Sequence, residues 1–136
     1  MQRHEFLKLI SSGALLACSG CLNSCAPDYI DPAPKDINFT LDLLDIENAS
    51  LTPIGGSLIK NGVIVARITS TEYIAISQTC THETISVNFQ SAEKNFLCPR
   101  HGSKFDRNGN AINGPATKPL HKYNVEFNAG ILRVFS

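Results

Sequence analysis

Two short stretches of the chain each combine a thiol with an imidazole, two groups that bind transition metals. The first is Cys80–His82 and the second is Cys98–His101. Fifteen residues separate His82 from Cys98, so the four side chains follow one another as Cys, His, Cys, His. Structural zinc fingers usually present both cysteines before both histidines, with more than one residue between the first two ligands. The pattern therefore predicts a four-ligand metal site made of two loops, with a spacing that disfavours ordinary zinc.

These two stretches resemble the paired ligand boxes of the Rieske iron–sulfur protein family. The first box is matched by Cys80-Thr81-His82, and the second by Cys98-Pro99-Arg100-His101-Gly102-Ser103. Three further features of family members follow downstream, namely Phe105-Asp106, the turn glycine Gly109 and the proline loop Gly114-Pro115-Ala116. The likeness spans residues 62–136. It implies a [2Fe–2S] cluster held by Cys80, His82, Cys98 and His101.

Histidine ligation explains what such a cluster does. Two Fe³⁺, two sulfides and two thiolates sum to zero charge beside neutral imidazoles, so one-electron reduction creates a single negative charge. The electron is therefore accepted more easily than in an all-thiolate cluster. The resemblance places His82 and His101 on the outer iron at an exposed tip, and Cys80 and Cys98 on the inner iron. It also makes Ser103 a hydrogen-bond donor to a cluster sulfur.

The chain departs from the quinol-oxidising members of this family near the predicted site. Those members carry two extra cysteines that form a disulfide, and the resemblance assigns their positions to Ile85 and Arg100 here. Glu83 stands where an apolar residue is usual, and Phe105 replaces a tyrosine that often donates a hydrogen bond. Fewer donors leave the charge of the reduced cluster less stabilised. We therefore expect a midpoint potential well below that of quinol-oxidising members.

The elements that must position these loops are short strands. Val63–Ile68 and Tyr73–Ser77 are rich in β-branched residues, and Asn61-Gly62 is a strong hairpin signal. Further strands are predicted at Asn95–Cys98, Tyr123–Phe127 and Ile131–Phe135. Only Thr40–Ala49 hints at a helix, and a strand fits there equally well. The pattern predicts an all-β domain over residues 39–136. The resemblance makes this a Rieske-type fold of short antiparallel strands, with a cluster-binding subdomain of loops at about 78–118.

Residues 1–17 are typical of an export signal. Arg3 and Lys8 precede an apolar run that ends at Ala17, well short of the roughly 20 residues of a membrane-spanning helix. The four residues ending at Cys18 resemble the lipobox of bacterial lipoproteins, which predicts cleavage before Cys18 and a lipid on its sulfur. Leu16 is larger than the residue usual at its position. A plain cleaved signal and an uncleaved N-terminal anchor therefore remain as alternatives.

A proline-rich tether is predicted over residues 18–38, between the signal and the domain. Pro27, Pro32 and Pro34 alternate with aspartates, which disfavours both a helix and a central strand. From Cys18 to Phe39 such a tether reaches at most about 65–70 Å. The formal net charge is zero, so nucleic acid is not an expected partner. The expected partners are a redox protein or a larger membrane complex, with the membrane reached by lipid or by an N-terminal anchor.

Three functions fit these features. The first is a one-electron carrier or electron-transfer subunit of an oxidoreductase in the bacterial cell envelope, with its domain in the periplasm or at the outer surface. The second is a ferredoxin-type component that feeds an oxygenase, which the absent disulfide fits and the export signal does not. The third is a non-redox lipoprotein subunit of a surface assembly that retains the fold. An oxygenase itself is excluded, because its iron centre needs two further histidines and only His121 remains in the domain. We expect no catalytic site.

Overall fold

The computed structural model describes residues 31–136, so the predicted export signal, Cys18 and the first part of the tether lie outside the described residues. The described part contains strands and one short 3-10 helix, which confirms the predicted all-β class. In chain order the elements are β1 (Asn38–Asp42), η1 (Ile46–Leu51), β2 (Ser57–Lys60), β3 (Val63–Arg67), β4 (Tyr73–Ser77), β5 (Asn88–Gln90), β6 (Asn95–Leu97), β7 (Lys104–Phe105), β8 (Ala111–Asn113), β9 (Lys122–Asn128) and β10 (Ile131–Phe135). In residues 31–136 no helix is long and apolar enough to cross a membrane.

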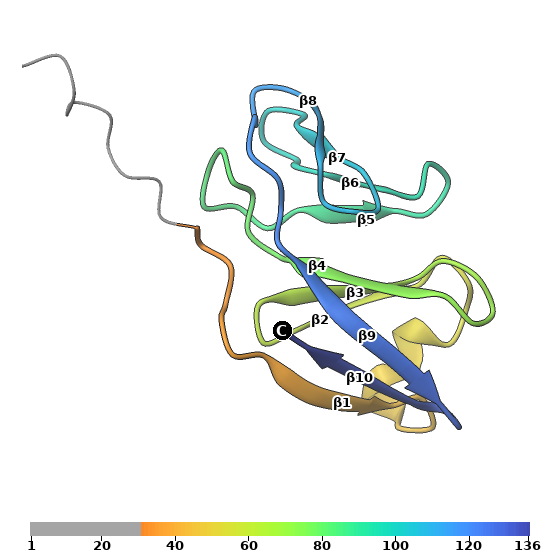
Figure 1. Ribbon diagram of the computed structural model, residues 1–136. Coiled ribbons are helices and arrows are strands. Elements are labelled where there is room, and N and C mark those ends of the chain that lie inside the picture. The colour runs from red at the N-terminus through yellow and green to blue at the C-terminus, as the bar shows by residue number, and fades with distance from the viewer. Residues whose placement is uncertain (1–30) are drawn as a thin grey trace, which may run out of the picture. The chain divides into compact units, whose positions relative to one another are not determined.

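Six of the strands form one antiparallel sheet with the order β1-β10-β9-β4-β3-β2 (Figure 1). The hairpin between β2 and β3 closes where Lys60 pairs with Val63. Asn61 and Gly62, the two residues between them, have φ values of 52° and 77°. Two consecutive left-handed residues make the tight turn that asparagine followed by glycine favours, because this turn matches the twist of the strands. The predicted hairpin is therefore present.

The remaining four strands form a smaller antiparallel sheet with the order β5-β6-β7-β8, above the large sheet in Figure 1. All four strands are only two or three residues long. Strands this short are stabilised mainly by the apolar core on which they pack. Phe96 and Phe105, which face each other across β6 and β7, are both fully buried. The small sheet thus serves mainly to carry the connecting loops.

Strands β3 and β4 have apolar cores on both of their faces. One core joins Ile64 and Ile76 to Phe96 and Phe105 of the small sheet and to the side chains of both predicted cysteine ligands. The other joins alternate residues of the same strands to β1 and β10, and its buried members include Val63, Val65, Tyr73, Ala75, Leu41, Leu132 and Val134. The loops that carry the predicted ligands are therefore built directly on a rigid central hairpin.

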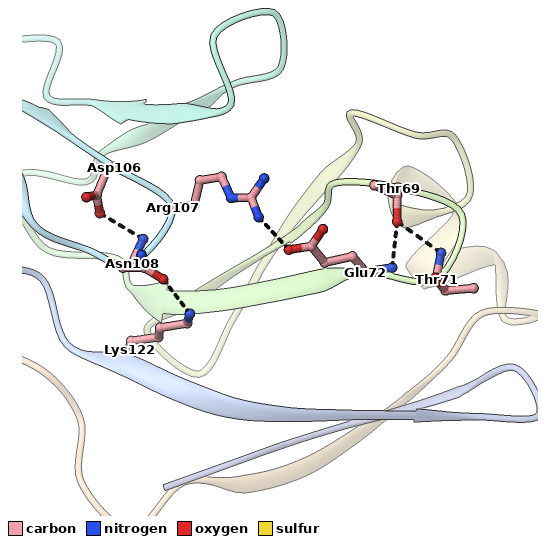
Figure 2. A network of polar contacts seen from close by, with 7 residues as sticks. All are labelled: Thr69, Thr71, Glu72, Asp106, Arg107, Asn108 and Lys122. Atoms are coloured by element: carbon pink, nitrogen blue, oxygen red, sulfur yellow. Dashed lines mark hydrogen bonds and ion pairs between the residues drawn. The ribbon is translucent and has the colours of Figure 1, made fainter.

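Polar contacts add a second connection between the two sheets (Figure 2). Arg107 donates to Glu72 at 2.7 Å, and Lys122 donates to the side-chain oxygen of Asn108 at 2.8 Å. Glu72 ends the turn before β4 and Lys122 begins β9, whereas Arg107 and Asn108 lie in the turn that follows β7. Asp106 holds that turn in place by accepting a hydrogen bond from the Asn108 backbone N–H at 2.8 Å. These contacts fix the turn against the large sheet.

The end of the predicted tether packs on the domain in the described residues. Ala33 is buried, and the hydroxyl of Tyr123 donates to the carbonyl of Pro34 at 2.6 Å. A few residues further on, the Ser136 backbone N–H donates to the carbonyl of Ile37 at 2.9 Å. We call residues 31–37 the strap. The strap leads straight into β1, which pairs with β10.

Candidate metal centre

Three loops that connect strands build the candidate centre. The first loop, residues 78–87, joins β4 to β5; the second, residues 98–103, joins β6 to β7; and the third, residues 114–121, joins β8 to β9. The predicted ligands lie on the first two loops. Both of these loops therefore start from strands whose side chains pack in the core beneath the small sheet.

The first loop closes on itself. Thr79 and Ser86 form an isolated antiparallel bridge, and inside it the Cys80 N–H donates to the carbonyl of Ile85 at 2.7 Å. The Ile85 N–H in turn donates to the carbonyl of Glu83 at 2.7 Å. This narrow loop puts Cys80 at its base, buried, and His82 at its turn, exposed.

The second loop is also a closed turn. The Cys98 N–H donates to the carbonyl of Ser103 at 2.8 Å, and the Gly102 N–H donates back to the carbonyl of Cys98 at 3.1 Å. Gly102 has a φ of +75°, which glycine adopts without strain because it lacks a Cβ. The reversal leaves Cys98 fully buried and His101 exposed. Both loops therefore present one buried thiol and one exposed imidazole.

The predicted donors come together as two pairs. Cys80 and Cys98 are 2% and 0% exposed, and neither forms a disulfide. Burial raises the pKa of Cys80, and the neighbouring Cys98 raises it further, against the lowering effect of two backbone N–H groups. On the exposed side the rings of His82 and His101 meet edge to face, with their centroids 5.4 Å apart. The structure therefore brings the two predicted thiols together and, separately, the two predicted imidazoles.

The third loop supports the other two through hydrogen bonds. The Ala116 N–H donates to the buried hydroxyl oxygen of Ser103 at 3.0 Å, and the Thr81 hydroxyl donates to the carbonyl of Lys118 at 2.7 Å. Each ligand loop is thus attached to the third loop by a side chain next to or near its ligands. Because the Ser103 oxygen accepts this bond, its own proton can be donated elsewhere.

Sequence reasoning did not find one contact of the site. The carboxylate of Glu83 lies 3.1 Å from Nε2 of His101 and 3.1 Å from Nε of Arg100. Ligand atoms of Glu83, His82 and His101 all lie within 4.8 Å of one another. The sequence does hint at this contact, because the acidic Glu83 directly follows His82 and the basic Arg100 directly precedes His101.

The donor set fits a [2Fe–2S] cluster bound by two thiolates and two imidazoles. In Rieske centres two histidines replace two cysteines on one of the two irons. Here the sulfur donors lie together on the buried side and the nitrogen donors on the exposed side. A bound cluster would thus have one iron facing the core and the other facing solvent.

Comparison with known proteins identifies the class. A protein-family model described as the Rieske [2Fe-2S] domain matches residues 42–124, more than half of the chain. The chain therefore belongs to the Rieske [2Fe–2S] domain family, and its cofactor is a [2Fe–2S] cluster. The family and the cofactor expected from the two ligand boxes are both confirmed. The identity of the ligands stays a prediction.

Proteins similar to the chain include a subunit of a cytochrome complex, a plasma membrane protein and a ferredoxin. The chain is 35% identical over 128 residues to the cytochrome b6-f complex iron-sulfur subunit of Chlorobaculum thiosulfatiphilum, a match that covers 90% of the chain and 68% of that subunit. The cyanobacterial plasma membrane Rieske protein PetC3 from Synechocystis PCC 6803 superposes with a TM-score of 0.55 at 29% identity, over 65% of the chain and 93% of that structure. The ferredoxin of carbazole 1,9a-dioxygenase from Nocardioides aromaticivorans IC177 shares the fold, with a TM-score of 0.53 at 24% identity over 75% of the chain and 98% of that structure.

Proposed function

We propose that the chain is a one-electron carrier or electron-transfer subunit of a cell-envelope oxidoreductase, with Cys80, His82, Cys98 and His101 as the ligands of its cluster. The observation that carries this proposal is the pair of exposed imidazoles above two buried, adjacent thiols. When bound, the cluster takes up and releases one electron at a time. The similarity to a cytochrome b6-f complex iron-sulfur subunit supports a redox partner within a membrane complex.

Some residues of the site would hold the cluster, and others would expose it to a partner protein. Cys80 and Cys98 are buried, so they would hold a bound cluster on the side away from water. On the other side His82 and His101 reach the surface, where a partner protein can approach the outer iron closely. The Ala116 N–H holds the hydroxyl oxygen of Ser103 in place, so that its proton would be free to be donated to a sulfur of a bound cluster.

Spectroscopy of the full-length protein tests the ligand set. We expect visible absorbance and, after reduction, an EPR signal of a histidine-ligated [2Fe–2S] cluster. Cys98→Ser and His101→Ala should lose both signals, because each removes a ligand. His121→Gln is the matched control, since His121 packs against Tyr123 of β9 with ring centroids 4.7 Å apart and is not a proposed ligand. A wild-type protein without the signals, or a Cys98→Ser variant that keeps them, would contradict the proposal.

We further propose that a lipid on Cys18 anchors the protein in the cell envelope. The lipobox-like residues before Cys18 support this, and so does the similarity to a plasma membrane Rieske protein. Mass spectrometry of the protein from a bacterial membrane fraction should find an N-terminal lipidated cysteine. The Cys18→Ser variant should carry no lipid. It should either be cleaved and absent from the membrane fraction, or keep its signal sequence uncleaved. A mature N-terminus at any other residue would rule out this anchor.

A further inference from the structure

Glu83 connects the two ligand loops with a single carboxylate. One oxygen lies 3.1 Å from Nε of Arg100 and the other lies 3.1 Å from Nε2 of His101. Glu83 directly follows His82 on the first loop, whereas both of its partners lie on the second loop. A single side chain therefore extends from beside one proposed iron ligand to the imidazole of the other.

We propose that Glu83 is a positioning residue that orients His101 and lowers the midpoint potential of the cluster, and that Arg100 limits this effect by balancing the charge of Glu83. The proposal rests on the ligand set proposed above. Because Nε2 of His101 faces Glu83, the ring nitrogen left for iron is Nδ1. A histidine that donates its second N–H to a carboxylate is fixed in tautomer and orientation, and it becomes a more basic ligand.

The effect on potential follows from the charges. The cluster core with its two thiolates is neutral when oxidised and carries one negative charge when reduced. A carboxylate at the site repels the added electron, whereas a guanidinium attracts it. The side chain of Arg100 is 61% exposed and that of Glu83 only 32%, so water screens the positive charge more strongly. The pair together thus lowers the potential.

This electrostatic role differs in its consequences from a purely mechanical one. If Glu83 served only to tie the loops together, removing either partner of the ion pair would loosen the site in the same way. Both changes would then reduce cluster retention, and neither would shift the potential of the cluster that remains. If charge is decisive, the two changes shift the potential in opposite directions. The sign of each shift therefore separates the two roles.

Protein-film voltammetry of the full-length holoprotein is the test. Glu83→Gln keeps the shape of the side chain and removes its charge, so it should favour reduction by on the order of tenfold, which is about 59 mV for a one-electron couple. Arg100→Gln should shift the potential the other way, and Arg100→Lys should stay near wild type. Glu93→Gln is the matched control, because Glu93 is an exposed acid in the turn between β5 and β6.

Shifts of the same sign for Glu83→Gln and Arg100→Gln, or no shift in either, would overturn the proposal. Visible absorbance is recorded first for every protein. A wild-type protein without a cluster would overturn the proposed function, whereas normal clusters with unshifted potentials would overturn this inference alone. If Glu83→Gln loses its cluster, the Arg100→Gln variant decides between the two roles. That variant keeps Glu83, and its midpoint potential falls below that of wild type only if the charge of Glu83 acts on the cluster.

Discussion

Replacing Tyr123 by phenylalanine should make the stability of the protein less sensitive to alkaline pH. Burial raises the pKa of Tyr123 to about 12, and the carboxylate of Asp31 adds to this rise. In its protonated form the hydroxyl donates to the carbonyl of Pro34 at 2.6 Å. In the unfolded chain the same hydroxyl ionises near pH 10.

The sign and size of the effect follow from this difference. Between about pH 10 and pH 12 the folded state holds a proton that the unfolded state has released, so the free energy of unfolding falls as the pH rises. Two pKa units correspond to about 2–3 kcal/mol, of which about 2 kcal/mol is lost by pH 12. At neutral pH the hydroxyl is protonated in both the folded and the unfolded state, so none of this pH-linked stability has been lost. Tyr123→Phe then removes only the hydrogen bond, and the free energy of unfolding should fall by about 1 kcal/mol, the usual net value of one hydrogen bond.

The assay is urea denaturation of wild type and Tyr123→Phe side by side from pH 7 to pH 12. Other groups titrate in this range as well, but the difference between the two curves isolates Tyr123. We expect wild type to be more stable at pH 7 and the two curves to cross above pH 10. Tyr73→Phe is the control at neutral pH, because the buried hydroxyl of Tyr73 has no partner in the described residues and its removal should cost little.

Parallel stability curves for wild type and Tyr123→Phe across pH 10–12 would refute this reasoning. They would mean that the Tyr123 hydroxyl ionises in the folded state as it does in the unfolded chain. The hydrogen bond to Pro34 would then be open to water, and the strap would not be held at this point.

Four further predictions concern the loops and the cluster. Gly109→Ala should lower the free energy of unfolding by about 2–4 kcal/mol, because Gly109 has a φ of +86° and a Cβ there would lie 2.4 Å from the carbonyl oxygen of Leu120; a loss below about 1 kcal/mol in urea denaturation would contradict this. Ser103→Ala should lower the midpoint potential by roughly 40 mV, equivalent to about 1 kcal/mol for one hydrogen bond to the reduced cluster, and voltammetry should show no such change if the hydroxyl does not contact it. Arg107→Gln should cost less than about 1 kcal/mol and should lose its effect in high salt, since the side chains of Arg107 and Glu72 are 47% and 41% exposed and water screens the pair. The wild-type midpoint potential should lie well below the upper end of the Rieske range of about +300 mV. A value of about +250 mV or more would contradict the idea that the site has too few hydrogen-bond donors to stabilise the reduced cluster.

The strands that could be predicted are those with a strong local pattern. Tyr73–Ser77 and Ile131–Phe135 form β4 and β10 with the predicted bounds. In contrast, β1 was not separated from the helix-like segment after it, and the structure divides that segment into a strand that ends at Asp42 and a 3-10 helix that starts at Ile46. The reason is tertiary, because β1 is held by pairing with β10, where Leu41 lies opposite Leu132.

The same distinction applies to the site. Ligand types and spacing were enough to identify the two loops, since the chemistry of thiol and imidazole depends little on the rest of the fold. The contact between Glu83 and His101 was not predicted, because it spans two loops whose approach depends on the strands beneath them. The deep burial of Cys80 and Cys98 likewise follows from a core that extends from the large sheet to the small one.

The strap changes the range over which an anchored domain can search for a partner. If the chain is fixed at Cys18, Asp31, the first residue of the strap, lies thirteen residues further along the chain and so at most about 43–47 Å from the anchor. A tether that ran free to Phe39 would be about half as long again. Local concentration falls as roughly the −3/2 power of tether length, so packing the strap concentrates the domain about twofold near the membrane. For a domain anchored in this way, a redox partner would be reached most readily if its docking surface lay close to the bilayer.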